Sequence, residues 1–409
     1  EMQRSLVGSE MCIRDRSKST IYMSQGKYVM SEESGLGVIV RKNVKAIKGG
    51  YSQFSEGTDV SARDIDTYVT VISGDVNGNK QADAGDCGLL LVKKGHITIE
   101  GVTFQYGYVS EADASTTECG SGIYVSGGAG DTSIELTDCV IRDCTSGVTT
   151  SAKQGGPAVF VLSGQVRLNN VNLLDNTAVG RGGAVRCNSK TAVVFMNGCL
   201  LKGNSHNGSW GNGIQMSEGH ICINNTTLID NMGTGAALNG GGSILLTNNT
   251  IIGNTSDSHG AVRCETGVGG DTKFINNLLL SENPSAPSFN LNGSNFEAFS
   301  KGYNVYQRVT GITMSASDTA YPNPVNGTLD EKGVYVWDLN QIGSVKGYAT
   351  KQAVIEVAKS FNPVASPIAN LGEVFVEWVG EDAFGIDQRE VTRNANKMQA
   401  GAYDAVLTN

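Results

Sequence analysis

One nine-residue phrase recurs through the middle of the chain and constrains its fold more than any other feature. The phrase runs apolar residue, any residue, Asn, two free positions, apolar residue, two free positions, Asn. It occurs in full at 168–176, 223–231, 246–254 and 275–283, and looser copies begin at Ile99, Leu136 and Phe195. Successive copies start 37, 32, 27, 28, 23 and 29 residues apart, which indicates a constant core unit joined by loops of variable length.

Each repeat predicts short strands rather than helices. The apolar runs are rich in Ile, Val and Leu, are bounded by Gly, Asn, Ser and Thr, and nowhere offer a helical stripe ten residues long. A second phrase precedes the later copies, for example GAVRC at Gly183 and again at Gly260. Two or three strands at fixed offsets in every repeat are the content of one coil of a parallel β-helix, so we predict an all-β solenoid.

The recurring Asn residues have a physical reason in such a solenoid. Equivalent residues of successive coils lie ~4.8 Å apart, so buried amides can hydrogen-bond to the coils above and below in a stacked column. We predict an inward-facing Asn ladder for at least one of the two Asn positions. The alternative is that both are turn residues, because Asn tolerates the left-handed backbone of sharp corners.

Composition and charge exclude several classes of protein. Fifty-three Gly, seven Pro and 17% charged residues fit many thin strands and many turns. The net charge of −9 argues against nucleic acid as a partner. No apolar run approaches the ~18 residues that span a bilayer, so we expect no transmembrane segment.

The first residues differ from the rest. Residues 2–17, MQRSLVGSEMCIRDRS, closely resemble the translation of a sequencing-library adaptor. The stretch has no apolar core behind a basic start, so it does not have the pattern of a signal peptide. We therefore expect residues 1–18 to be non-native, and the natural N-terminus with any signal peptide to be missing.

Motifs at both ends of the remaining chain point to a known group. IYMSQGKYVM at Ile21, AIKGGY at Ala46 and RDIDTYVTVISGDVNGN at Arg63 stand near one end, and DQREVTR at Asp387 with GAYD at Gly401 close the other. These segments resemble a broad group of bacterial secreted or surface proteins with a right-handed parallel β-helix of the pectin-lyase-like type. The resemblance implies fold more than activity, because fold does not determine function.

The resemblance and the repeats together give a domain plan. We expect a single-stranded right-handed parallel β-helix with irregular loops and a C-terminal cap. Its parts are N-terminal coils at 19–98, repeat coils at 99–283, and C-terminal coils, aromatic-rich loops and a cap at 284–409. Residues 289–345 are rich in aromatic side chains, which we expect to cover the open end of the solenoid; stacking on sugar rings is the alternative. EVFVEWVG from Glu373 predicts a strand.

Residues 75–86, DVNGNKQADAGD, are the best candidate for a metal site. Oxygen-bearing side chains recur there at the spacing of a calcium loop: Asp75, Asn77, Asn79, Gln81, Asp83 and Asp86. However, Lys80 stands where such loops carry a sharp-turn Gly, and Asp86 is shorter than the usual Glu. Calcium is one interpretation, and a polar hairpin built on Asn77-Gly78 without a metal is the other.

The best candidates for ligand binding are Arg186 and Arg263, which occupy the same place in the two GAVRC phrases. We place them three coils apart, hence at ~14 Å, which suits contacts with successive sugars or anionic groups of an extended chain. Arg181, His259 and Glu265 are expected to line the same face. The alternative is that these arginines are solvated or salt-bridged surface residues.

The catalytic motifs of polysaccharide-degrading β-helices are not found. Pectin hydrolases carry NTD, DD and GHG motifs that supply paired carboxylates, and none occurs here; His96 and His220 each stand in GHI. A lyase would need a Lys or Arg base, often beside calcium. There is no CxxC and no paired His for zinc or redox chemistry, so we expect most of the eight Cys beyond residue 18 to be small buried hydrophobes. A disulfide such as Cys139 with Cys199 would require adjacent coils, and the copy at Leu168 lies between them.

Two classes of function remain. GGAV at Gly182 and LLDN at 173–176 resemble the short repeats of polymorphic outer-membrane proteins, which are surface adhesins. This resemblance and the missing hydrolase motifs favour a secreted or cell-surface protein, similar to an adhesin, that binds a polysaccharide, a cell-surface glycan or another surface without catalysis. The alternative is a polysaccharide lyase or hydrolase that acts on uronate-containing polymers with a divergent site.

Overall fold

The computed structural model describes most of the chain. The described residues are 4–5, 19–30, 38–40, 44–53, 59–112, 121–128, 130–149, 154–208, 210–254, 260–265, 272–281, 287, 289–292, 300–310, 314–321, 327–329, 335–337 and 347–402. His259 lies outside these ranges, as do Cys119, one of the eight Cys beyond residue 18, and much of the aromatic stretch 289–345.

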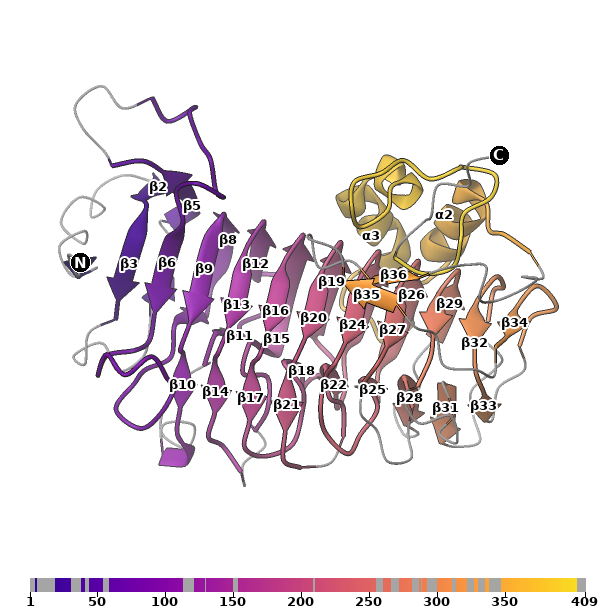
Figure 1. Cartoon of the computed structure of the whole chain (residues 1–409), viewed down its shortest axis with the longest axis horizontal. Coiled ribbons are helices and arrows are strands. Elements are labelled where there is room, and N and C mark those ends of the chain that lie inside the picture. The colour runs from indigo at the N-terminus through magenta and orange to yellow at the C-terminus, as the bar shows by residue number, and fades with distance from the viewer. Residues whose placement is uncertain are drawn as a thin grey trace.

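The chain winds into a solenoid whose coils each contribute parallel strands to three long sheets, which confirms the predicted parallel β-helix (Figure 1). Sheet A contains β1 (Arg4–Ser5), β3 (Gly26–Val29), β6 (Thr70–Ser73), β9 (Val102–Gln105), β13 (Val140–Arg142), β16 (Asn172–Leu174), β20 (Leu200–Lys202), β24 (Thr227–Ile229), β27 (Thr250–Ile252), β30 (Leu278–Leu279), β32 (Val305–Tyr306) and β34 (Thr319–Ala320). Sheet B contains β2 (Ser19–Ser24), β5 (Val44–Tyr51), β8 (Gly95–Glu100), β12 (Thr132–Thr137), the second half of β15 (Val159–Asn169), β19 (Ala192–Asn197), β23 (His220–Asn224), β26 (Ser243–Thr247) and β29 (Thr272–Ile275).

Sheet C joins sheet B through β15. It contains β4 (Val38–Val40), β7 (Leu90–Val92), β11 (Ile123–Ser126), the first half of β15, β18 (Val185–Cys187), β22 (Ile214–Met216), β25 (Leu238–Gly240), β28 (Val262–Glu265), β31 (Phe289–Asn292) and β33 (Val309–Thr310). A short sheet D lies at the corner between sheets A and C, with β10 (Tyr108–Val109), β14 (Thr145–Ser146), β17 (Thr177–Ala178) and β21 (Ser205–His206). The hairpin β35 (Gly327–Leu329) and β36 (Tyr335–Trp337) is antiparallel.

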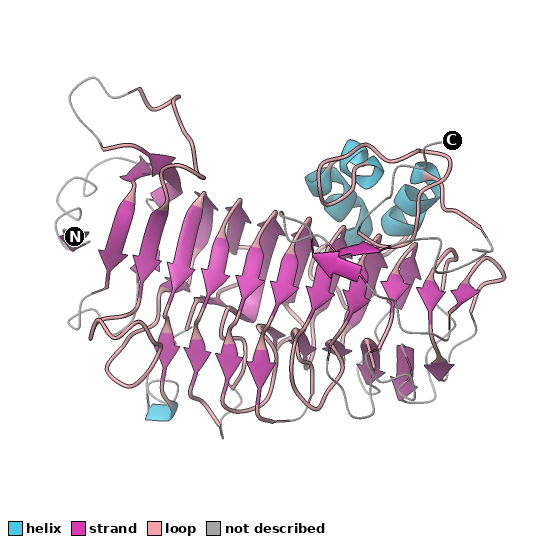
Figure 2. Ribbon diagram, in the orientation of Figure 1, coloured by secondary structure: helices cyan, strands magenta, loops and turns pink. Residues whose placement is uncertain are grey.

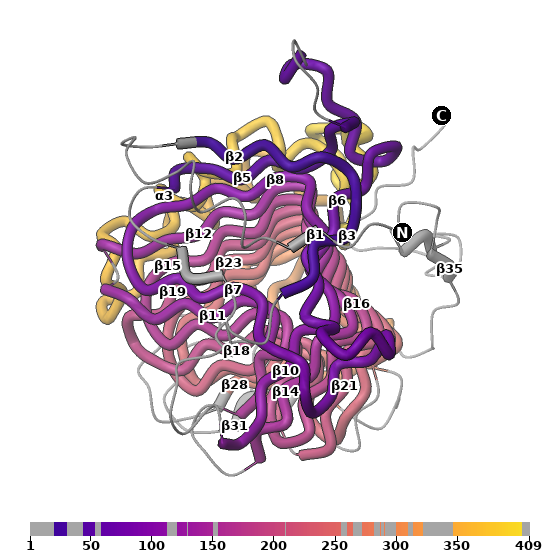
Figure 3. The backbone as a smooth tube through the Cα atoms, turned by 90° about the vertical axis from the view of Figure 1, so that its left-hand side faces the viewer, coloured from indigo at the N-terminus to yellow at the C-terminus, as the bar shows by residue number. Residues whose placement is uncertain are grey.

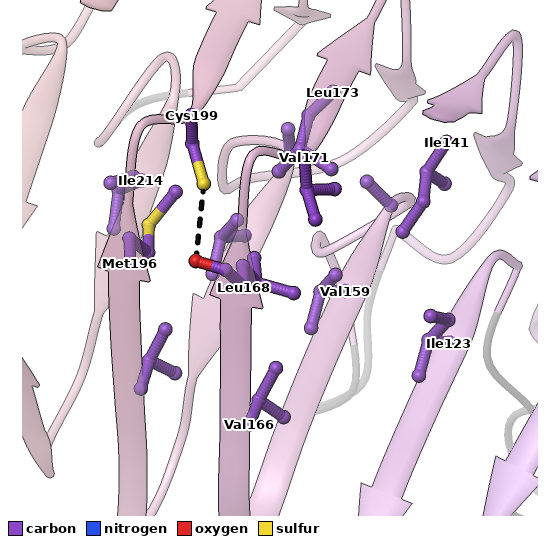
Figure 4. Packing of buried hydrophobic residues seen from close by; sticks show 14 of the residues in the cluster. Ile123, Ile141, Val159, Val166, Leu168, Val171, Leu173, Met196, Cys199 and Ile214 are labelled. Carbon is purple, nitrogen blue, oxygen red and sulfur yellow. Dashed lines mark hydrogen bonds between the residues drawn. The ribbon is translucent and has the colours of Figure 1, made fainter. Parts of the chain in front are cut away.

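Consecutive copies of the phrase stack directly on one another, as the end-on view makes plain (Figure 3). In sheet B, Leu168 stands opposite Met196, Met196 opposite Ile223, and Ile223 opposite Leu246. These side chains belong to one apolar core that runs through the inside of the coils (Figure 4). The last copy requires a correction, because Leu246 pairs with Phe274 and the repeat therefore begins one residue before the predicted Ile275.

The second Asn of the phrase forms the predicted inward ladder. Asn176, Asn204, Asn231 and Asn254 are at most 2% exposed. The Nδ2 of each of the first three donates to the Oδ1 of the next, at 2.9, 2.8 and 2.8 Å. The same Nδ2 atoms also donate to a main-chain carbonyl of the preceding coil, so the ladder satisfies polar groups on both sides of every coil that it crosses.

The first Asn of the phrase serves the corner between sheets B and A instead. Asn170, Asn225 and Asn248 have φ values of 53°, 48° and 59°, in the left-handed region that Asn tolerates better than most residues. The turn interpretation is therefore correct for this position. A further buried ladder that we did not predict follows the corner, in which Asn249 Nδ2 donates to Asn277 Oδ1 and Asn277 Nδ2 donates to Asn304 Oδ1.

The C-terminal segment contains helices, which corrects the strand predicted from Glu373. The helices are α2 (Lys351–Lys359), α3 (Leu371–Val379) and the short 3-10 helix η4 (Glu381–Gly385) (Figure 2). They lie along the side of the solenoid over sheet B. Phe375 and Phe384 of this segment pack with Phe195, Cys222 and Leu245 on the outer face of the sheet.

The apolar outer face of sheet B explains why this segment is helical. Residues 371, 375 and 376 fall on one side of a helix, and that side can be buried only because the sheet beneath it is apolar. Strand β12 alternates buried and partly exposed residues, whereas β23 and β26 are buried throughout. Strands covered on both faces have this pattern, so β23 and β26 lie beneath the covering layer.

Candidate functional site

Four polar side chains follow one another along the outside of sheet C. Arg186 of β18 stands opposite Gln215 of β22, Gln215 opposite Asn239 of β25, and Asn239 opposite Arg263 of β28. Their strand neighbours, such as Val185 and Cys187, lie in the core, so alternation directs the four outward. Three strand spacings separate the two arginines, ~14 Å, as predicted. We call this row the arginine face.

Arg186 is buried although it points away from the core. It is 7% exposed. Its Nη1 donates to the carbonyl of Gln154 at 2.6 Å and its Nη2 donates to Asn188 Oδ1 at 3.1 Å. Its guanidinium carbon lies 5.8 Å from the centre of the Phe160 ring, within cation–π range. The Nε has no hydrogen-bond partner.

The charge of Arg186 is not neutralised within the part of the chain that the structure describes. Its hydrogen-bond acceptors there are a carbonyl, an amide and a hydroxyl, and it forms no ion pair with a described residue. Burial, and then the positive charge of Arg181, lower the pKa of Arg186 to about 10. A buried cation without a counter-charge costs free energy, and an anion bound beside Arg186 would lower that cost.

Trp210 joins the other two arginines of the predicted site. Its ring centre lies 5.8 Å from the guanidinium carbon of Arg181 and 5.9 Å from that of Arg263. Trp210 is partly exposed and stands in the loop between β21 and β22. We did not predict its role, although a lone Trp in the glycine-rich stretch GSWGNG at Gly208 is a signal that could have identified it.

The structure places the remaining predicted ligand-binding residues only in part. Arg181 is exposed and precedes β18, so it lies beside Arg186 as expected. Glu265 ends β28 and its backbone pairs with Asn292. His259 lies outside the described residues. Arg181, Arg186 and Arg263 are thus brought together with Trp210, and they form the candidate site.

The predicted calcium loop follows β6, and its side chains mostly bind one another and the loop backbone. Asp83 accepts from Asn77 Nδ2 at 2.9 Å and from Asn79 Nδ2 at 2.7 Å. Asp86 accepts from the N–H of Val76 at 2.9 Å. Among the described residues, no three His, Cys, Asp or Glu side chains gather as a metal site would require.

Asp75 of this loop is paired outside it. Its Oδ2 accepts from Lys27 Nζ at 2.8 Å, and its Oδ1 accepts from the N–H of Lys80 at 3.2 Å. Lys80 takes the φ of 62° that a Gly would supply in a calcium loop. The N–H of Gln81 donates to Asn79 Oδ1 at 2.8 Å, a further contact within the loop.

The surroundings of His96, His220 and the described Cys residues indicate structural roles. His96 contacts Ser133 Oγ at 2.7 Å on sheet B, and His220 lies buried under the C-terminal segment, 3.3 Å from the carbonyl of Ala365. Seven described Cys are buried and form no disulfide, and burial raises the pKa of Cys139 and Cys199 to about 12. One coil separates these two, as predicted, so they do not form a disulfide.

No described helix has the length and apolar character needed to cross a membrane.

Comparison with known proteins identifies the fold but no relative of known activity. A family model described as "Right handed beta helix region" matches residues 67–279. The match covers the coils from β6 to β30, and therefore includes Arg181, Arg186, Trp210 and Arg263. Comparisons with curated proteins and with solved structures give no match.

Proposed function

The chain belongs to the family of right-handed β-helix regions, and on that premise we propose that it is a non-catalytic binding protein whose arginine face takes an acidic glycan. One observation carries the proposal: Arg186 is buried in the outer face without a carboxylate partner among the described residues. A carboxylate or sulfate on a sugar would supply the missing counter-charge, and guanidinium groups bind such anions in a fixed geometry.

The surroundings of Arg186 favour a sugar chain over a single small anion. Gln215 and Asn239 are buried between the two arginines and bind each other, Asn239 Nδ2 donating to Gln215 Oε1 at 3.2 Å, so they form the base of the row. Arg263 repeats the positive charge ~14 Å further along the solenoid. Trp210 adds an aromatic ring between Arg181 and Arg263.

We also propose that the protein works in secreted form or at the cell surface. The support is the resemblance of its terminal motifs and repeats to secreted β-helix proteins and surface adhesins. An acidic glycan outside the cell is consistent with that location.

The test compares Arg186→Gln with Arg142→Gln in isothermal titration calorimetry. The probes are polygalacturonate and, as a neutral polymer, dextran. Arg142 is the matched control, because it is an exposed arginine of sheet A that already pairs with Asp143, Nε to Oδ2 at 2.6 Å. Gln removes the charge at position 186 and keeps part of the hydrogen bonding.

We expect the wild type to bind polygalacturonate and not dextran. Loss of a charge-assisted hydrogen bond costs about 1.5–3 kcal/mol, so Arg186→Gln should weaken binding about 10- to 100-fold while Arg142→Gln changes it little. Equal affinity of the wild type and Arg186→Gln would contradict the proposal. So would the absence of binding to any acidic polymer in a panel of uronate and sulfated glycans.

A glycoside hydrolase is the second candidate, on one observation at the corner between sheets A and D. Asp143 and Asp175 follow β13 and β16, which are adjacent strands, and both have left-handed φ values of 53° and 54°. Burial, and then the charge of Asp143, raise the pKa of Asp175, while Arg142 pairs with Asp143. A carboxyl group whose pKa is raised by burial, placed beside a second carboxyl group, is the arrangement that glycosidases use. Release of reducing ends from polygalacturonate, lost in Asp175→Asn, would support hydrolysis and reject the binding-only proposal.

A further inference from the structure

Trp210 is held in an unusual conformation that the core does not require. Its φ is 99°, a value that non-glycine residues rarely adopt and that costs free energy. Its side chain is only partly buried and belongs to none of the apolar core clusters formed by the described residues. Strain of this kind persists only where the surroundings impose it, and it is common at ligand clamps. The contacts that impose it therefore matter to the site.

Two side chains hold the loop of Trp210 in place. The N–H of Gly211 donates to Gln215 Oε1 at 2.8 Å, and this oxygen also accepts from Asn239 Nδ2 at 3.2 Å. On the other side, Asn212 Oδ1 lies 3.0 Å from His206 Nε2. Trp210 stands directly before these two anchored residues.

The protonation state of His206 follows from these contacts. Asn212 Oδ1 accepts from the N–H of Gly235 at 3.2 Å, which establishes that this atom is the oxygen of the amide. His206 Nε2 must then carry the proton that it shares with Asn212. In the neutral ring Nδ1 is the acceptor, and it is buried and finds no hydrogen-bond donor among the described residues. His206 itself is 5% exposed.

The next coil closes over this arrangement. Gly233 lies against the His206 ring and Asn212, and Gly235 lies against the carbonyl of Trp210, where neither position has room for a Cβ. A second proton on His206 would place a positive charge in this closed space. We propose that His206 is the positioning residue of the Trp210 loop, and that its protonation releases the loop and weakens capture of the anionic ligand. This inference rests on the proposed function of the arginine face.

The described residues that pack on His206 carry no other titratable group. Residues 207–208, 210–213 and 232–236 lie beside His206 and contain no ionisable side chain. In sheet D, His206 stands opposite Ala178 of β17. The nearest charged groups along these strands are Asp175, Asp230 and Arg181, and none of them contributes to the pKa shift of His206.

The direction of the pH dependence follows from burial. Burial lowers the pKa of His206, and the contact with Asn212 and the carbonyls of Trp210 and Gly208 only partly oppose this. With the loop released, the ring would titrate near its ordinary value of ~6.5. The held conformation of the loop is therefore fully favoured above that pH. As the pH falls below it, the equilibrium shifts from the held to the released loop by up to about tenfold per pH unit for one linked proton.

The experiment measures polygalacturonate affinity between about pH 5.5 and 7.5, a range in which carboxylates with pKa values near 4 stay ionised. Dextran sulfate is the second probe, because its charge does not change in this range. The variant is His206→Gln, whose amide N–H can still donate to Asn212 but cannot titrate. His96→Gln is the matched control, since His96 is on sheet B and pairs with Ser133.

We expect the affinity of the wild type and of His96→Gln to fall by up to about tenfold per pH unit below ~6.5, and that of His206→Gln to stay level. The same pH profile in the wild type and in His206→Gln, with binding intact, would overturn the inference and leave the proposed function standing.

A readout without ligand separates the two proposals further. Acidification should shift the fluorescence of Trp210, measured as the difference between the wild type and Trp210→Phe, and His206→Gln should abolish the shift. If no acidic polymer binds but this shift occurs, the proposed function fails and the role of His206 in holding the loop stands. If the shift is absent or persists in His206→Gln, His206 does not hold the loop.

Discussion

Removal of one amide from the inner ladder should destabilise the solenoid far more than removal of an amide from a corner. Asn204 is fully buried. Its Oδ1 accepts from the N–H of Asn176 at 3.1 Å, and its Nδ2 donates to the carbonyl of Leu173 at 2.9 Å and to Asn231 Oδ1 at 2.8 Å. Asn204→Ala therefore takes partners from two neighbouring coils at once.

The magnitude follows from the groups left without a partner. The N–H of Asn176 loses its acceptor, and the carbonyl of Leu173 loses a donor, both away from water. Each buried orphan costs about 1–3 kcal/mol, so Asn204→Ala should lower the free energy of unfolding by about 3–5 kcal/mol. The control is Asn170→Ala at the exposed corner, where placing Ala in the left-handed conformation costs about 1–2 kcal/mol.

The assay is urea unfolding followed by circular dichroism, with the m-value checked for each variant because long repeat arrays can lose cooperativity. Hydrogen exchange gives a local readout, since the amide of Asn176 should lose protection in Asn204→Ala while the amides of distant coils keep it. If the free energies of unfolding of Asn204→Ala and Asn170→Ala differ by less than about 1 kcal/mol, the ladder does not stabilise the solenoid as its geometry indicates.

Two further predictions concern the loop after β6 and the helical layer. Because Asp75 already pairs with Lys27, Asp75→Ala should lower the free energy of unfolding by about 1–3 kcal/mol, equally with and without calcium. If calcium raises the melting temperature of the wild type and this variant abolishes the rise, the loop is instead a calcium loop. Phe375 is fully buried against Phe195, so Phe375→Ala should cost about 3–5 kcal/mol and expose the C-terminal segment to limited proteolysis, whereas Val364→Ala at a fully exposed site should change neither.

The residue pattern determined the solenoid and much of its interior. The recurrence of Asn231 and its equivalents at the end of each phrase was enough to predict a stacked amide column, because repeated units in a β-helix necessarily superpose. The interval between Arg186 and Arg263 was predictable for the same reason: it depends only on the count of coils between two identical phrases. The one-residue error at Ile275 arose where two adjacent Asn made the register ambiguous.

Tertiary structure alone decided what covers the coils. The segment at Glu373 has residues that favour strands, yet it is helical because the apolar outer face of sheet B buries one side of it. Likewise, no local pattern shows that Trp210 lies between Arg181 and Arg263, or that His206 reaches Asn212 beneath it. These contacts join loops of different coils, and their geometry depends on loop shapes that the repeating phrase does not contain. The repeating phrase thus determines the scaffold, and the loops that pack on the scaffold determine the site.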